Sequence, residues 1–260
     1  MDLEGELTHL DLSDADAASS SGVDGGSESR RRICDNCSRP ENVCLCGSLP
    51  SEPISTATQI VILHHPHEHR HKLSTVPILT KCLLNTHTIV GRRLRHGSSA
   101  MLDSLHSSSS TDQLPRAIYL FPGPTSTHIS QLNPKPGTVL ILFDATWKHA
   151  KEMVDASAEY LSTFAIRACL DCDFGETGGS IFDSELILRK EPFRGCVSTM
   201  EAAARALRFL EPNGPGIESR LLNVLREMVR FQTSHLKPMK PRPKLLKKVN
   251  LRKNKNDEIF

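Results

Sequence analysis

Long hydrophobic runs are absent from this chain of 260 residues, in which 38% of the positions are hydrophobic. No stretch approaches the roughly 18 consecutive apolar residues of a membrane-spanning helix, so the sequence predicts no transmembrane segment. The N-terminus lacks the basic start and apolar core of a secretory signal, and it is too acidic for a transit peptide. We therefore expect an intracellular, soluble protein, in the cytoplasm, the nucleus or both, without a membrane partner.

Aromatic residues are scarce, at 5% of the chain, and Trp147 is its single tryptophan. A GxGxxG turn after a strand is missing as well. That absence disfavours an ordinary dinucleotide site or a Rossmann-type methyltransferase site.

Each end of the chain lacks charges of one sign. The net charge of the whole chain, +2, does not show this uneven distribution. Residues 1–28 hold eight acidic residues and no Lys or Arg, and residues 237–255 hold nine basic residues and no acid. One-signed, low-complexity segments of this kind are typical of disordered tails. We predict a leader at 1–30, a small cysteine-containing module at 31–56, a main domain at 57–234 and a basic tail at 235–260.

Short apolar runs alternate with helical patterns from about residue 57 onward. This alternation predicts an α/β fold, with a mainly parallel sheet and helices on both of its faces. The predicted strands are 59–65, 86–91, 116–121, 138–144, 164–170 and 184–190, and the predicted helices are 73–84, 98–106, 147–161, 197–210 and 217–233. The Pro-rich segment 121–137 is predicted to be a loop.

Four cysteines lie close together in the segment CDNCSRPENVCLC. In a reducing compartment, thiols are more often metal ligands or buried side chains than disulfides. Four thiolates close a tetrahedral zinc shell with no open position, so the site would be structural; unligated thiols or redox pairs are the alternative. The predicted ligands are Cys34, Cys37, Cys44 and Cys46.

Five histidines lie at the end of the first predicted strand and in the loop after it, in the segment ILHHPHEHRHKLS. Their spacing in a loop argues against a second metal site, because they are not placed one helical turn apart. A loop at the carboxyl edge of a parallel sheet that is rich in donors suits an anionic partner such as phosphate, and a solvated charged loop is the alternative. The candidate RNA or phosphate ligands here are His65, Glu68, Arg70 and Lys72.

The apolar run LILF leads directly into Asp144. An Asp at the edge of a buried strand can act as a base, Thr146 can cap the following helix, and Trp147 can stack on a base or wall a pocket. The alternative is that Asp144 is the helix N-cap and that Trp147 is a core residue.

The sequence DATW after a hydrophobic strand resembles the signature of the DTW-domain family, and other segments match that family in order. The Cys cluster lies upstream, HHPHEHRHKLST resembles the family's His-Pro-x-Glu loop, and STMEA (198–202) resembles its late Ser-Thr-x-Glu-Ala motif. The resemblance covers roughly residues 33–234. KLSTVPIL replaces the Asn-Thr-Gly element of bacterial members, which places the chain closer to eukaryotic ones.

The resemblance implies a tRNA-uridine aminocarboxypropyltransferase with a SPOUT-like knotted cofactor site. Such an enzyme transfers the 3-amino-3-carboxypropyl group of S-adenosylmethionine to N3 of a tRNA uridine, giving acp3U and 5′-methylthioadenosine. Asp144 is then the candidate base, with Thr146 and Trp147 beside it. The implied cofactor-binding residues are Leu186, Leu188, Pro192, Ser198, Thr199 and Glu201. Ser198 and Thr199 stand at a predicted helix start, whose free backbone N–H groups we expect to hold the cofactor carboxylate together with the two hydroxyls.

Ser198 and Glu201 also fit a capping box, which is a purely structural role. In the basic tail, Lys240, Lys247 and Lys248 suit tRNA phosphates, and nuclear targeting is their alternative role. We expect tRNA and not DNA as the partner, and the sequence leaves the oligomeric state open. A SPOUT-like RNA methyltransferase and a zinc-containing RNA-binding protein without catalysis are the two alternative functions.

Overall fold

A computed structural model describes residues 32–71, 74–108, 116–133, 136–170 and 197–234. The chain divides into two compact units, Met1–Arg32 and Ile33–Phe260. Every helix and strand described below lies in the second unit.

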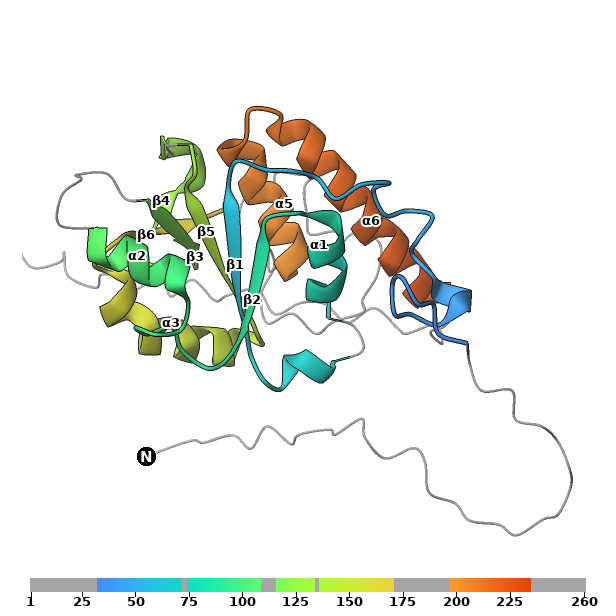
Figure 1. Ribbon diagram of the computed structural model, residues 1–260, viewed down its shortest axis with the longest axis horizontal. Helices are drawn as coiled ribbons and strands as arrows, with labels where there is room; N and C mark the ends of the chain where they lie inside the picture. Colours follow the sequence, from blue (N-terminus) through green and yellow to red (C-terminus); the bar gives the residue numbers. More distant parts are fainter. Residues whose placement is uncertain (1–31, 72–73, 109–115, 134–135, 171–196, 235–260) are drawn as a thin grey trace, which may run out of the picture. The chain divides into compact units, whose positions relative to one another are not determined.

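The centre of the second unit is a six-stranded sheet in the order β2-β1-β5-β3-β6-β4, and all of its strand pairs are parallel (Figure 1). The predicted parallel α/β sheet is therefore confirmed. The strands are β1 (Gln59–His64), β2 (Thr86–Val90), β3 (Ala117–Leu120), β4 (Thr127–His128), β5 (Val139–Asp144) and β6 (Ala165–Cys169).

Helices cover both faces of the sheet, as predicted (Figure 1). On one face, α1, α5 and α6 pack against alternate residues such as Ile60 and Ile62; on the other, α2 and α3 pack against Val61 and Leu63. This split follows from the two-residue period of a strand. The helices are α1 (Val76–Cys82), α2 (Ala100–Ser108), α3 (Trp147–Leu161), α5 (Thr199–Leu210) and α6 (Gly214–Ser234), with short 3-10 helices η1 (Glu41–Val43), η2 (Glu68–Arg70) and η3 (Ile129–Gln131).

The central strands are buried because helices lie on both of their faces. In β5, five of the six residues are buried, including Asp144 at its carboxyl end. In β1, all residues after Gln59 are buried. These two strands lie side by side, with His64 opposite Asp144 in the register.

One predicted loop contains regular structure. The Pro-rich segment holds the two-residue edge strand β4 and η3. Its side chains gave no strand signal because β4 is only two residues long and pairs with β6 alone. Helix α6 also begins earlier than predicted, at Gly214, where an added Cβ would collide with the carbonyl group of Arg208.

The cysteine-containing segment shares the core of the sheet domain. Leu45 is fully buried, and both Leu45 and Ile54 belong to the apolar cluster that α5 and α6 form with the sheet. Segment η1 contacts α6. The packing therefore joins residues 33–56 to the core of the sheet domain, and the domain boundary at residue 56 remains a prediction.

Several predictions lie outside the described residues. These are the strand at 184–190, the leader at 1–30, the basic tail at 235–260, and the part of the knotted cofactor site around Leu186. Among the described residues, no helix is long and apolar enough to span a membrane.

Candidate functional site

The candidate site begins at the carboxyl ends of β1 and β5. His64 ends β1 and Asp144 ends β5, and the two are paired in the sheet register. The backbone N–H of His65 donates a 2.9 Å hydrogen bond to the carbonyl oxygen of Asp144, which extends the ladder past the strand ends. The carboxyl edge of a parallel sheet is where open α/β folds place their ligands.

Side chains from two other elements hold the carboxylate of Asp144. Nδ1 of His64 lies 2.9 Å from Oδ2, and the hydroxyl of Thr199, the first residue of α5, donates a hydrogen bond to Oδ1. The Asp144 side chain is 11% exposed. A carboxylate with two oxygens offers about four lone-pair directions, so these contacts orient it and leave acceptor capacity for a ligand.

The pairing changes the acid–base behaviour of His64. Burial by itself lowers the pKa of this imidazole, but the contact with Asp144, aided by Glu68, outweighs burial and raises the pKa above its usual value. The site therefore favours an imidazolium beside the carboxylate over a wider pH range than free histidine would allow.

We predict that the His64–Asp144 contact stabilises the fold most on the acidic side of neutrality. Because the pKa of His64 is raised on folding, its contribution is fully present below about pH 6.5 and is lost as the pH rises through the folded pKa. The difference in unfolding free energy between the wild type and His64→Gln should shrink in urea titrations as the pH is raised from below about 6.5 to above it. His87→Gln, at an exposed histidine of β2, is the matched control. A difference that grows with pH would contradict the assignment.

Thr146 caps α3. Its side chain accepts a hydrogen bond from the backbone N–H of His149, with extended backbone angles at Thr146. The alternative in which Asp144 caps this helix is therefore wrong. Thr146 is exposed beside the site, and its capping contact gives it a structural task in addition to any catalytic one.

Trp147 is half-buried at the first position of α3. Its ring lies 5.7 Å from the ring of Phe121, and the guanidinium of Arg167 lies 5.3 Å from the centre of the Phe121 ring. Arg167 also donates hydrogen bonds to the carbonyl oxygens of Phe121 and Pro122. A partly exposed indole suits contact with a nucleic-acid base.

Two of the predicted phosphate ligands, His65 and Glu68, are less exposed than residues of a solvated loop would be. His65 is only 3% exposed, and its ring stacks on His149 at 4.4 Å. Burial, followed by the neighbouring His149, His67 and Arg92, lowers the pKa of His65. Glu68 begins η2 and is half-buried.

The late motif forms the start of α5. Ser198 is the N-cap, and its hydroxyl accepts a 3.2 Å hydrogen bond from the backbone N–H of Glu201. Glu201 is fully buried, and its carboxylate lies 2.7 Å from Arg205. This geometry confirms the Ser198 half of the capping box.

The backbone at the start of α5 is less available than the sequence indicated. We expected its free N–H groups to hold the cofactor carboxylate, but the N–H of Met200 donates to the hydroxyl of Thr75, and that of Glu201 donates to Ser198. These two groups are therefore satisfied within the protein. Thr199 instead directs its hydroxyl to Asp144.

The structure does not describe the side chains of the remaining predicted site residues. The side chain of Arg70 is not described, and the others lie outside the described residues: Lys72, Leu186, Leu188, Pro192, Lys240, Lys247 and Lys248. Their assignments remain predictions.

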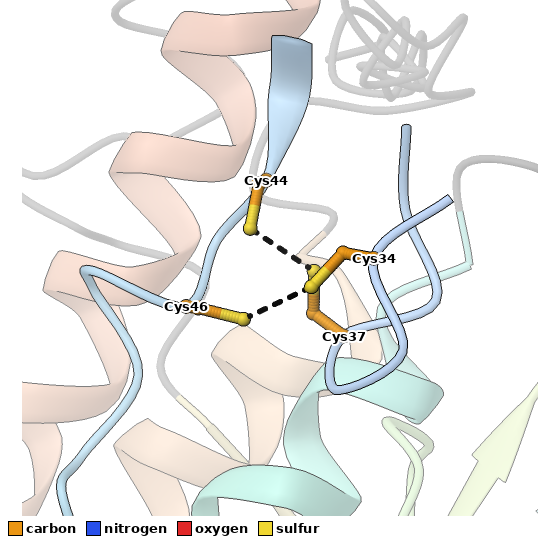
Figure 2. Close-up of side chains that lie close together, drawn as sticks. All are labelled: Cys34, Cys37, Cys44 and Cys46. Atoms are coloured by element: carbon orange, nitrogen blue, oxygen red, sulfur yellow. Dashed lines mark hydrogen bonds between the residues drawn. The ribbon is translucent and has the colours of Figure 1, made fainter. Parts of the chain in front are cut away.

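The side chains of the four N-terminal cysteines point toward one another (Figure 2). The sulfurs of Cys34 and Cys46 are 3.4 Å apart, those of Cys37 and Cys44 are 3.6 Å apart, and all four lie within 4.8 Å of one another. Tetrahedral zinc with bonds of about 2.3 Å needs sulfurs about 3.8 Å apart. The residues therefore fit a structural zinc ion, and these cysteines are free rather than disulfide-bonded.

The local turn chemistry explains how this cluster forms. The backbone N–H of Ser38 donates to the carbonyl oxygen of Cys34, and Ser38 adopts a positive φ of 55°. Hydrogen bonds from the backbone of Cys37 and from Cys46 lower the pKa of Cys34 to about 6, whereas the contact with Cys34 raises that of Cys46 to about 12. Four thiolates at this spacing need a cation between them, which a zinc ion would supply.

Three residues make contacts at the site but had no role predicted from the sequence. His64 was one of five loop histidines, and its special feature is its position as the last residue of β1, opposite Asp144. Thr75 and His149 gave no signal, because their partners lie on α5 and on the β1 loop, far away in the sequence.

Known proteins resemble this chain over most of its length. Residues 31–233 match the model of the DTW domain. The chain is 54% identical over 239 residues to tRNA-uridine aminocarboxypropyltransferase A of Arabidopsis thaliana, covering 84% of this chain and 88% of that protein. It is 31% identical over 215 residues to tRNA-uridine aminocarboxypropyltransferase 2 of Drosophila melanogaster, covering 81% and 79% of the two chains. No solved structure matches significantly.

Proposed function

This chain belongs to the DTW domain family, and from that premise we propose that it transfers the 3-amino-3-carboxypropyl group of S-adenosylmethionine to N3 of a uridine in tRNA. The products are acp3U and 5′-methylthioadenosine. Two relatives named for this activity support the proposal. The chain matches both over most of their length, and it is 54% identical to one of them.

The observation that carries the proposal is the placement of Asp144. Its carboxylate stands at the carboxyl edge of the sheet, 11% exposed, between His64 and Thr199. Uridine N3 carries a proton that must leave before the nitrogen can attack carbon. A carboxylate oriented by two neighbours is suited to accept that proton as a general base.

The chemical step then needs no general acid to protonate the leaving group. The N3 proton passes to Asp144, the N3 lone pair forms a bond to Cγ of the methionine part, and the Cγ–sulfur bond breaks. The electron pair returns to the sulfonium sulfur, which leaves as neutral methylthioadenosine. Since the leaving group needs no proton, the remaining task of the protein is positioning. Among the described residues, Trp147 is the proposed contact for a base near the site.

Two further assignments accompany the reaction. We assign structural zinc to Cys34, Cys37, Cys44 and Cys46 because the sulfur spacing fits a tetrahedral shell. We propose that the basic residues of the His-rich loop and the tail bind tRNA phosphates, because Lys and Arg bind the phosphate backbone whatever the nucleotide sequence. A location in the cytoplasm, the nucleus or both remains part of the proposal.

Product analysis tests the function directly. The purified full-length protein is incubated with S-adenosylmethionine and tRNA that lacks modification, and the digested nucleosides and small-molecule products are identified by mass spectrometry. We expect a uridine that has gained the aminocarboxypropyl group, with one methylthioadenosine for each modified uridine. A methylated nucleoside with S-adenosylhomocysteine would instead identify a methyltransferase. Tight tRNA binding without any product across a full tRNA set would indicate a binding protein.

A further inference from the structure

Three histidines from two separate parts of the chain meet beside the candidate site. His65 follows β1 directly, His67 precedes η2, and His149 lies in the first turn of α3. One nitrogen from each ring can be chosen such that all three lie within 4.8 Å of one another. The sequence argued against a metal site here because the loop histidines alone lack ligand spacing, and the third ring comes from a helix that only the tertiary fold brings near.

The rings are fixed by one another. His65 and His149 stack at 4.4 Å with 11° between their planes, and the ring of His67 stands nearly perpendicular to that of His65 at 4.9 Å. The backbone N–H of His67 donates to Nδ1 of His65. That hydrogen bond requires a lone pair and no proton on Nδ1 of His65, which is the form in which a ring nitrogen binds a metal. A bound ion would take the place of the N–H group at this nitrogen.

One buried nitrogen in the cluster is unexplained by packing. Nδ1 of His149 is buried, and within the described ranges it has no hydrogen-bond partner. Stacking of aromatic rings accounts for the apolar faces of the imidazoles but leaves such a nitrogen unsatisfied, which costs free energy. An ion is one of the few groups that removes this cost.

We propose that His65, His67 and His149 form a second metal site, which takes a divalent transition metal of the zinc class. Imidazole nitrogens without carboxylate ligands select zinc, copper, nickel or cobalt over magnesium and calcium. Bonds of about 2.0–2.1 Å place tetrahedral nitrogens about 3.4 Å apart, so binding draws the rings together and tilts the stacked pair. Three protein ligands leave a fourth position for water or an oxygen of a bound molecule.

Such a site would connect the β1 loop to the start of α3 next to Asp144. His65 already bonds to the backbone of Asp144, and His149 follows Trp147 by two positions. The ion would therefore restrain the two segments that flank the carboxylate. This inference does not depend on the reaction proposed above.

Metal stoichiometry on the full-length protein tests the proposal. The protein is stripped with a chelator, refilled with Zn²⁺, desalted and analysed for bound metal. The wild type should hold two equivalents, one in the cysteine cluster and one in the histidine cluster. His67→Ala and His149→Ala should each hold one, with Zn²⁺ binding at the histidine cluster weakened more than the roughly 100-fold that loss of an outer contact causes. His67 is exposed, so its replacement should leave the fold unchanged.

The control is His87→Ala, which removes an exposed histidine outside the cluster and should keep two equivalents. Refilling with Co²⁺ separates the two sites, because only the cysteine site gives sulfur-to-cobalt charge-transfer absorption. That absorption should persist unchanged in His67→Ala. One equivalent in the wild type, or two equivalents retained in His67→Ala and His149→Ala, would overturn the proposal.

Discussion

Asp144→Asn is expected to lower the rate of aminocarboxypropyl transfer by about 10²–10⁴-fold, the range that a positioned general base contributes. Asparagine keeps the size of the side chain and an oxygen that can accept from Thr199, but it cannot take the proton from uridine N3. The loss should therefore appear in kcat, while the affinity for tRNA changes little. Single-turnover assays with saturating S-adenosylmethionine measure it.

The matched control is Asp155→Asn, which changes an exposed carboxylate on α3 away from the strand edge. Its rate should stay within about twofold of the wild type, because exposed substitutions away from such features have small effects. Thermal unfolding and circular dichroism of both variants establish that the fold is intact. A rate for Asp144→Asn close to that of Asp155→Asn would rule out the base assignment, whatever the product analysis shows.

Cys37→Ser is expected to remove one bound zinc ion and to lower the melting temperature substantially. Cys37 is 3% exposed, and its sulfur lies 3.6 Å from that of Cys44, so the hydroxyl of serine replaces a buried ligand. A ligand at 1,000 times its dissociation constant stabilises the native state by about 4 kcal/mol. For a domain of this size each kcal/mol shifts the melting temperature by about 2–4 °C, which gives roughly 10 °C.

The effect should reach beyond the cysteine segment, because Leu45 is fully buried in the cluster that includes α5 and α6. Cys169→Ser is the control, since it removes a half-buried thiol of β6 that belongs to no metal cluster among the described residues. Calorimetry with and without added Zn²⁺ measures both variants. Equal melting temperatures and equal zinc contents for Cys37→Ser and the wild type would contradict a structural zinc.

Prediction from the sequence succeeded where the signal is local. The run VLILF identified β5 because a strand buried on both faces has no polar positions. The cysteine cluster could be found because its four cysteines lie within 13 residues, so short turns alone bring the sulfurs together. Thr146 and Ser198 were recognised as caps from residue type and position, and both cap their helices.

Prediction failed where contacts join distant segments. The sequence indicated free N–H groups at the start of α5, but the N–H of Met200 donates to the hydroxyl of Thr75, which lies far away in the sequence. The sequence assigned His64 no role different from that of the four neighbouring histidines, because only the register of β1 against β5 places its ring beside Asp144. It did not connect His149 with the β1 loop, because His149 lies on another element, α3, and only the tertiary structure stacks its ring on that of His65.

The amino-acid sequence by itself determined the parallel α/β fold, the cysteine cluster and the acid at the end of β5, because hydrophobic period, turn residues and ligand spacing act over a few neighbouring positions. The tertiary structure alone decided which side chains hold that acid. His64, Asp144 and Thr199 come from β1, β5 and α5, and their approach depends on strand register and on helix packing against the sheet. Those are set by the burial of the whole core, which no short stretch of sequence encodes.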